Sequence, residues 1–131
     1  MNIAGIEDTI LARLRNAEIE GLALVWPNLQ TKLPVPRAVV QTSFGETFDA
    51  TLDASAPFVP GFIMVTVVTE EGKGTTESLQ FAAQIVALYP MGLRLTAPDG
   101  KIEIKRHPSI LTGFSQGGAW RQPVKISFEA G

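Results

Sequence analysis

Apolar residues near the start of the chain recur at spacings of three and four: Ile3, Ile6, Ile10, Leu14 and Ala17. The charged residues of this stretch lie mostly outside that stripe. The pattern predicts an amphipathic helix of about four turns, from near Asn2 to near Gly21. We expect its apolar side to pack on a sheet, because the opposite face is mixed in charge rather than basic, as a membrane-binding helix would be.

Stretches typical of strands follow. Leu22–Trp26 is a short apolar run, Arg37–Phe44 is rich in β-branched residues, and Thr47–Leu52 alternates apolar and polar residues. The last two stretches could pair as a hairpin or connect through a longer excursion. Proline-bearing loops are expected at 27–36 and 53–61. Phe62–Thr69 is apolar on both faces, which predicts a central strand covered on at least one side by helices.

A second helix is predicted after the charged turn at 70–74. Thr75 or Thr76 can cap its start, and Pro90 ends it just after Tyr89. Its apolar stripe consists of Leu79, Ala82, Ala83 and Val86. Three further apolar residues make the stripe wider: Phe81, Ile85 and Leu88. A helix this apolar is either nearly buried or has a second face against a partner subunit.

The last third predicts a hairpin and a final strand. Leu93–Ala97 and Lys101–Lys105 flank the turn Pro98-Asp99-Gly100, with Ile102 and Ile104 expected to point inward. A loop is expected from 109 to 119. Strict alternation from 120 to 129 predicts a strand with one buried face.

The order of elements is helix, strands, helix, hairpin, strand. It predicts an α+β fold in which two helices pack on a mostly antiparallel sheet as a two-layer sandwich. At 131 residues, the chain is expected to be one domain, residues 1–131.

The amino-acid composition and net charge argue against several classes of function. The net charge of −2 gives no basic field that would attract nucleic acid or a membrane surface. The absence of cysteine and the single histidine exclude disulfides, thiolate metal sites and His-rich metal sites, and no cofactor is expected. Glu7 and Asp8 stand where a signal peptide would be basic, and the run Phe62–Val68 is too short to span a bilayer. We therefore expect a cytoplasmic protein, unless it leaves the cell in a particle.

The segment Gly113–Gly117 matches G-x-S-x-G, the nucleophile elbow of α/β-hydrolases. An elbow needs a helix after the serine, but two glycines and Pro123 follow Ser115. The only histidine, His107, precedes the serine instead of following it. A small serine hydrolase using Ser115 is therefore a distant alternative. We favour a Gly/Ser-rich loop that leads into the last strand, with no catalytic residue.

Two other charged segments are candidates for chemistry. Gly72-Lys73-Gly74 precedes a helix but lacks the full phosphate-loop pattern, so a simple turn is predicted. Glu70 and Glu71 are adjacent, which in a strand end makes a poor acid–base pair. The basic cluster at Lys101–His107 could form a polar subunit contact or touch passing DNA weakly.

Five short motifs, in this order and spacing from Trp26 to the C-terminus, resemble one family. They are Trp26-Pro27-Asn28, Gly61 before Phe62–Val68, Gly72-Lys73-Gly74, Ala87-Leu88-Tyr89-Pro90, and Gly118-Ala119-Trp120-Arg121-Gln122-Pro123-Val124-Lys125-Ile126-Ser127-Phe128. The pattern resembles the tail terminator, or tail completion, proteins of bacteriophages with long non-contractile tails.

The resemblance implies a structural virion protein without catalysis. It implies a homo-oligomeric ring, usually of six copies, at the head-proximal end of the tail tube, assembled in the host cytoplasm. Such a ring stops polymerisation of the tail tube protein, offers a docking surface to the head–tail connector protein, and lets DNA pass through its lumen. Another head–tail joining or minor tail protein is the alternative. The candidate interface segments are 27–36, 53–60 and 101–107.

Overall fold

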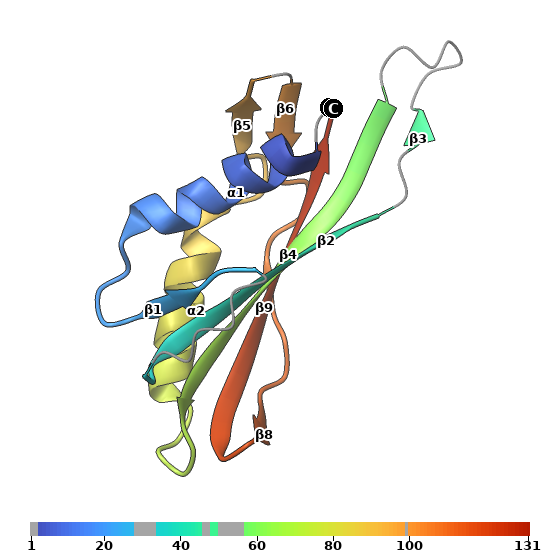
Figure 1. The fold of residues 1–131 in the computed structure, drawn as a ribbon. Coiled ribbons are helices and arrows are strands. Elements are labelled where there is room, and N and C mark those ends of the chain that lie inside the picture. The colour runs from blue at the N-terminus through green and yellow to red at the C-terminus, as the bar shows by residue number, and fades with distance from the viewer. Residues whose placement is uncertain (1–2, 28–33, 46–47, 50–56, 99) are drawn as a thin grey trace.

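The structure, a computed structural model, describes residues 3–27, 34–45, 48–49, 57–98 and 100–131 (Figure 1). Its elements in chain order are α1 (Ile3–Ala17), β1 (Ala23–Val25), β2 (Arg37–Phe44), β3 (Phe48–Asp49), β4 (Pro57–Glu70), α2 (Thr76–Leu88), β5 (Arg94–Ala97), β6 (Gly100–Glu103), β7 (Ser109–Ile110), β8 (Phe114–Gln116) and β9 (Ala119–Ala130).

The strands join in the order β1-β2-β4-β9-β6-β5. β3 pairs with β4, whereas β7 and β8 pair with β9. Only β1 and β2 run parallel among the described pairs. The longest ladder is antiparallel and joins β4 to β9, from Val59 opposite Ala130 to Glu70 opposite Ala119. These two strands form the centre of the sheet.

The predicted two-layer sandwich is wrong. Strands dominate the described residues, and the sheet curls instead of lying under a layer of two helices (Figure 1). Strand length explains the difference, because β4 and β9 are 14 and 12 residues long and twist accumulates along paired strands. The two helices also pack on different parts of the molecule. α1 contacts β5 and α2, while α2 contacts β4, β7 and β9.

Both predicted helices are confirmed. In α1, Ile6, Ile10 and Leu14 of the predicted stripe are fully buried. The helix ends at Ala17, before the predicted end near Gly21, and Glu18 directly after it has a φ of 48°. Gly21 lies in the following turn, where its φ of 79° favours glycine. In α2, Thr75 occupies the N-cap position, but its side chain makes no capping hydrogen bond.

The predicted loops hold more strand than expected. The loop at 53–61 is wrong from residue 57 onward, where β4 begins, and residues 53–56 lie outside the described residues. Its prolines fit because they fall near the start of the strand, where the Pro60 carbonyl accepts a hydrogen bond from the Gly45 N–H at 2.7 Å. The loop at 109–119 likewise contains β7 and β8.

The predicted hairpin near the C-terminus is confirmed, although β6 ends at Glu103 rather than at residue 105. Of the stretch predicted at 47–52, the structure describes only β3. β2 and β3 pair with consecutive parts of β4 and not with each other, so the proposed hairpin between them is wrong. Only residues 45–47 separate them in the sequence, so the proposed longer excursion is wrong too.

The core lies on the helix-covered face of the sheet. Ile63, Val65 and Val67 of β4 are fully buried there, next to Val124 and Ile126 of β9. The alternate side chains of β4 at 62, 64 and 66 are only partly buried, on the opposite face. The central strand is therefore covered by helices on one side, and its other apolar face is partly open.

A buried hydrogen bond joins the two helices. The Tyr89 hydroxyl, at the end of α2, donates to the Ile10 carbonyl of α1 at 2.7 Å. The Arg13 guanidinium donates nearby to the Leu88 carbonyl. Tyr89 is fully buried, and desolvation raises the pKa of its hydroxyl well above the usual value. The side chain therefore stays neutral and links α1 to α2.

We expect Tyr89→Phe to lower the free energy of unfolding by about 1 to 3 kcal/mol, because the Ile10 carbonyl would lose its buried partner. Denaturant unfolding followed by circular dichroism measures the loss. Gln84→Ala, on the exposed side of the same helix, is the control and should stay within about 0.5 kcal/mol of wild type. Equal stability of Tyr89→Phe and wild type would contradict this role.

Stability should also fall in alkali. The folded-state pKa of Tyr89 is raised, so its contribution is fully present below the unfolded pKa of about 10 and is lost as the pH rises above it. Tyr89 is the only tyrosine, so tyrosinate absorbance reports this group alone. We expect that absorbance to rise together with loss of the circular dichroism signal. Tyrosinate formed while the fold stays intact would contradict the buried environment.

Candidate assembly surfaces

The Gly113–Gly117 motif forms part of a β-hairpin. β8 pairs with β9, with Ser115 opposite Trp120. Gly117 and Gly118 connect the two strands with φ of 61° and 77°, as a two-residue type I′ turn requires. The prediction that this segment leads into the last strand is confirmed. The predicted loop is wrong in part, because it contains the short strand β8 and a tight turn. A nucleophile elbow would have a helix at this point.

Ser115 has no activating partner in the part of the chain that the structure describes. Its side chain is exposed, and no hydrogen bond joins it to His107 or to a carboxylate there. His107 is exposed too, in the segment between β6 and β7. A serine nucleophile requires a base within hydrogen-bond reach. The geometry therefore gives the hydrolase alternative no support.

The first glycine of the motif has a packing role. A Cβ atom at Gly113 would lie 2.8 Å from Oε1 of Gln122 and closer still to the Trp120 ring. The Gln122 side chain is held in place because its Nε2 donates to the Leu111 carbonyl. Only glycine fits between these two side chains without displacing them. Sequence reasoning missed this contact because it joins residues seven or more positions apart.

The turn at 72–74 is not a phosphate site. Gly72 and Gly74 have φ of 83° and 81° and are exposed, as in an ordinary turn. A cavity of about 310 Å³ lies beside Lys73, but the carboxylates of Glu70 and Glu77 line it too. Two acidic side chains disfavour a bound anion. The simple turn predicted from the sequence is confirmed.

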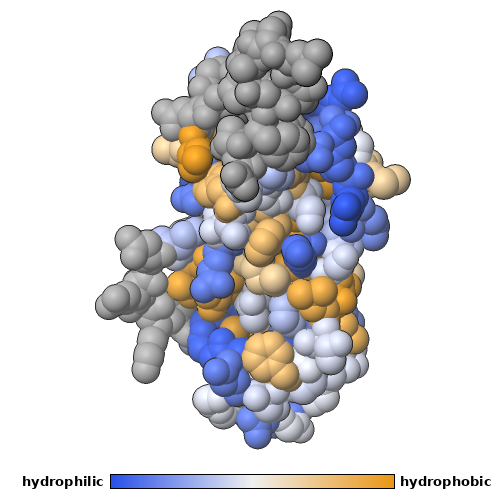
Figure 2. Space-filling view, turned by 90° about the vertical axis from the view of Figure 1, so that its right-hand side faces the viewer, coloured by the Kyte–Doolittle hydropathy of each residue, from blue (hydrophilic) through white to orange (hydrophobic). Residues whose placement is uncertain are grey.

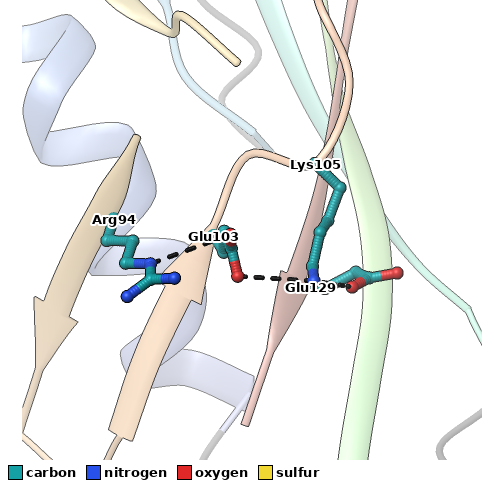
Figure 3. Close-up of polar contacts among 4 residues, drawn as sticks. All are labelled: Arg94, Glu103, Lys105 and Glu129. Carbon is teal, nitrogen blue, oxygen red and sulfur yellow. Dashed lines mark ion pairs between the residues drawn. The ribbon is translucent and has the colours of Figure 1, made fainter. Parts of the chain in front are cut away.

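The basic cluster predicted at 101–107 is partly neutralised. Figure 3 shows a row of ion pairs across β5, β6 and β9, in which the Arg94–Glu103, Lys105–Glu103 and Lys105–Glu129 distances are 3.7, 3.4 and 3.5 Å. We call this row the charge ladder. The side chain of Arg94 is 70% exposed, so each pair adds little stability. The ladder leaves this end of the sheet polar rather than strongly basic.

The outer side of α2 carries no charge. From Ser78 to Leu88 the helix has no charged residue, and five of its residues are exposed. We call these the α2 outer face: Leu79, Gln80, Ala83, Gln84 and Ala87. The sequence left open whether this helix is nearly buried or has a second face against a partner subunit. The structure excludes a nearly buried helix, because these five residues are exposed and Leu79 is 41% exposed.

The opposite face of the sheet has an apolar groove of about 540 Å³. We call it the sheet groove, lined by Val25, Trp26, Pro27, Val39, Val40, Gln41, Thr42, Ser43, Phe62 and Met64. On this face Gln41 lies opposite Met64 and Ser43 opposite Phe62, whereas the side chain of Thr42, opposite the buried Ile63, lies on the other face.

Figure 2 looks at the right-hand side of the molecule as drawn in Figure 1, and hydrophobic patches alternate there with hydrophilic residues. Three large apolar residues around β7 and β8 are exposed: Ile110, Leu111 and Phe114. Of the segments first considered for interfaces, 28–33 and 53–56 lie outside the described residues. The structure adds the sheet groove, which sequence reasoning did not define.

The described residues include no group of three or more metal-ligating side chains close enough to hold an ion. Within the same residues, neither helix has the length and apolar character needed to cross a membrane.

Comparison with known proteins identifies the class. The model of a family described as phage tail terminator protein matches residues 5–128. The match spans nearly the whole chain, which is thus a structural component of a phage virion with a role in the tail or in head–tail joining. This chain belongs to the phage tail terminator protein family, as its resemblance predicted.

Other comparisons add the fold alone. No curated protein matches the sequence. One solved structure aligns with 100% of this chain and 96% of its own, at a TM-score of 0.79 and 20% identity. At that identity the likeness concerns the arrangement of the backbone.

Two substitutions test whether the Gly113–Gly117 motif is structural. Gly113→Ala should lower the free energy of unfolding by about 1 to 3 kcal/mol, because the new methyl group overlaps the Trp120 ring. Ser115→Ala, two residues away and exposed, should change it by less than about 0.5 kcal/mol. Chemical denaturation of both variants gives the comparison. The packing role fails if Gly113→Ala is as stable as wild type.

Proposed function

We propose that this protein ends the tail tube of a phage with a long non-contractile tail. Copies of the chain, six in the expected ring, bind the last ring of tail tube protein at the head-proximal end and stop its polymerisation. The exposed side of the new ring then receives the head–tail connector protein, and DNA passes through the shared lumen. The chain acts by contact alone, without cofactor or catalysis.

The family match over residues 5–128 carries this proposal. The fold supports it, because a small chain that presents uncharged surfaces on two sides is suited to contacts with its own copies. Contacts between unlike surfaces close into a ring when the rotation between neighbours divides a full turn. A ring is also a natural stop for a tube, since it presents a new surface to the next component.

The proposal predicts what a phage without this protein accumulates. Tails should have tubes of irregular, mostly excessive length, because nothing ends polymerisation, and they should stay separate from filled heads. Electron microscopy of lysates from an amber mutant measures tube length and attachment. Supplying the wild-type chain from a plasmid should restore both.

Two results would overturn this function. Tubes of normal length that fail to join heads would favour another head–tail joining protein. Complete particles in the mutant lysate would exclude both roles. As a control, Ser115→Ala supplied from the plasmid should restore particles as well as wild type does, because this serine has no part in the proposed role.

A further inference from the structure

We propose that neighbouring copies join by packing the α2 outer face of one copy into the sheet groove of the next. This contact rests on the proposed ring and specifies which surfaces build it. The other exposed apolar residues, around β7 and β8, remain outside this interface.

The composition of the α2 outer face indicates a contact with other protein. Helix faces in contact with water normally carry charged side chains, whereas this one consists of leucine, glutamine and alanine. Leu79, Ala83 and Ala87 are spaced by four residues, so they form one line along the helix. Alanine side chains let a second backbone approach closely. The face is therefore built to contact protein rather than solvent.

The sheet groove is complementary in shape and polarity. Its apolar walls include Trp26, Phe62 and Met64, and its volume of about 540 Å³ has room for several small side chains. Gln41, opposite Met64, is exposed on this face and lines the groove. The amides of Gln80 and Gln84 carry both donors and acceptors. An incoming α2 would bring these amides to the amide of Gln41.

The two surfaces lie on opposite sides of the same sheet. α2 packs on the face of β4 that buries Ile63 and Val65, while Phe62 and Met64 alternate to the other face and line the groove. A copy can therefore engage one neighbour through its helix and another through its groove. Such a heterologous contact repeats from copy to copy, and a ring is its closed form.

Charge favours the same orientation. Glu77, exposed in the first turn of α2, borders the α2 outer face. Lys125 borders the groove, because its Nζ lies 4.6 Å from the centre of the Phe62 ring. Opposite charges at the rims steer two copies together and disfavour contact between two like surfaces.

The absence of cysteine allows a direct test by cross-linking. We would make Ala83→Cys, on the α2 outer face, and Gln41→Cys, in the groove, mix the two variants under ring-forming conditions, and add a short bismaleimide. Mass spectrometry should find the cross-link between the two introduced thiols at least about tenfold above a control mixture, in which Thr96→Cys on β5 replaces Gln41→Cys. A mixed yield no higher than the control overturns the contact.

A second measurement uses assembly itself. Ala83→Glu places a charge in the middle of the interface and should raise the concentration needed for ring formation by at least about tenfold, as measured by analytical ultracentrifugation. Gln116→Glu, exposed on β8, is the matched control and should assemble like wild type. Circular dichroism confirms that both variants fold.

The outcomes separate this contact from the proposed function. If wild type forms a ring and Ala83→Glu forms it equally well, the contact is overturned and the ring stands. If wild type forms no ring either alone or on purified tail tubes, the ring is overturned and the contact with it.

Discussion

The ladder between β4 and β9 is the constraint on which the rest of the structure depends. It fixes the register from Val59 opposite Ala130 to Glu70 opposite Ala119, and a slip of one residue would turn the buried side chains of one of the two strands to the opposite face of the sheet. Because side chains alternate, this single register puts a row of valines and isoleucines under α2 and leaves Phe62 and Met64 on the open face. Core and outer surface are thus set by one pairing.

That arrangement links the fold to a role in assembly. α2 packs on one face of β4 and β9, so the other face of these strands can contact other protein, and α2 itself has five exposed, uncharged residues. Family membership places the chain in a phage tail, and the two faces of the sheet are the surfaces through which we propose that its copies join.

The sequence predicted the elements that local chemistry determines. Periodicity located α1 and α2, and the alternation before Glu129 located β9. It did not predict β7 and β8, because strands of two and three residues are defined by pairing with a distant strand rather than by composition. It also gave the wrong layer architecture, because twist depends on how long strands pair. The sheet groove could not be predicted, since residues from β1, β2 and β4 meet there only after folding.

The charge ladder has a consequence for the solubility of the chain. β5 ends the sheet, and an uncovered edge strand is a template on which another chain can add a strand and start an aggregate. A strand arriving there would lie beside Arg94, whose charged side chain is 70% exposed, and charged side chains on an edge strand disfavour such pairing. The ladder thus acts as a gatekeeper: although each ion pair contributes little to stability, together they protect this edge against uncontrolled growth of the sheet.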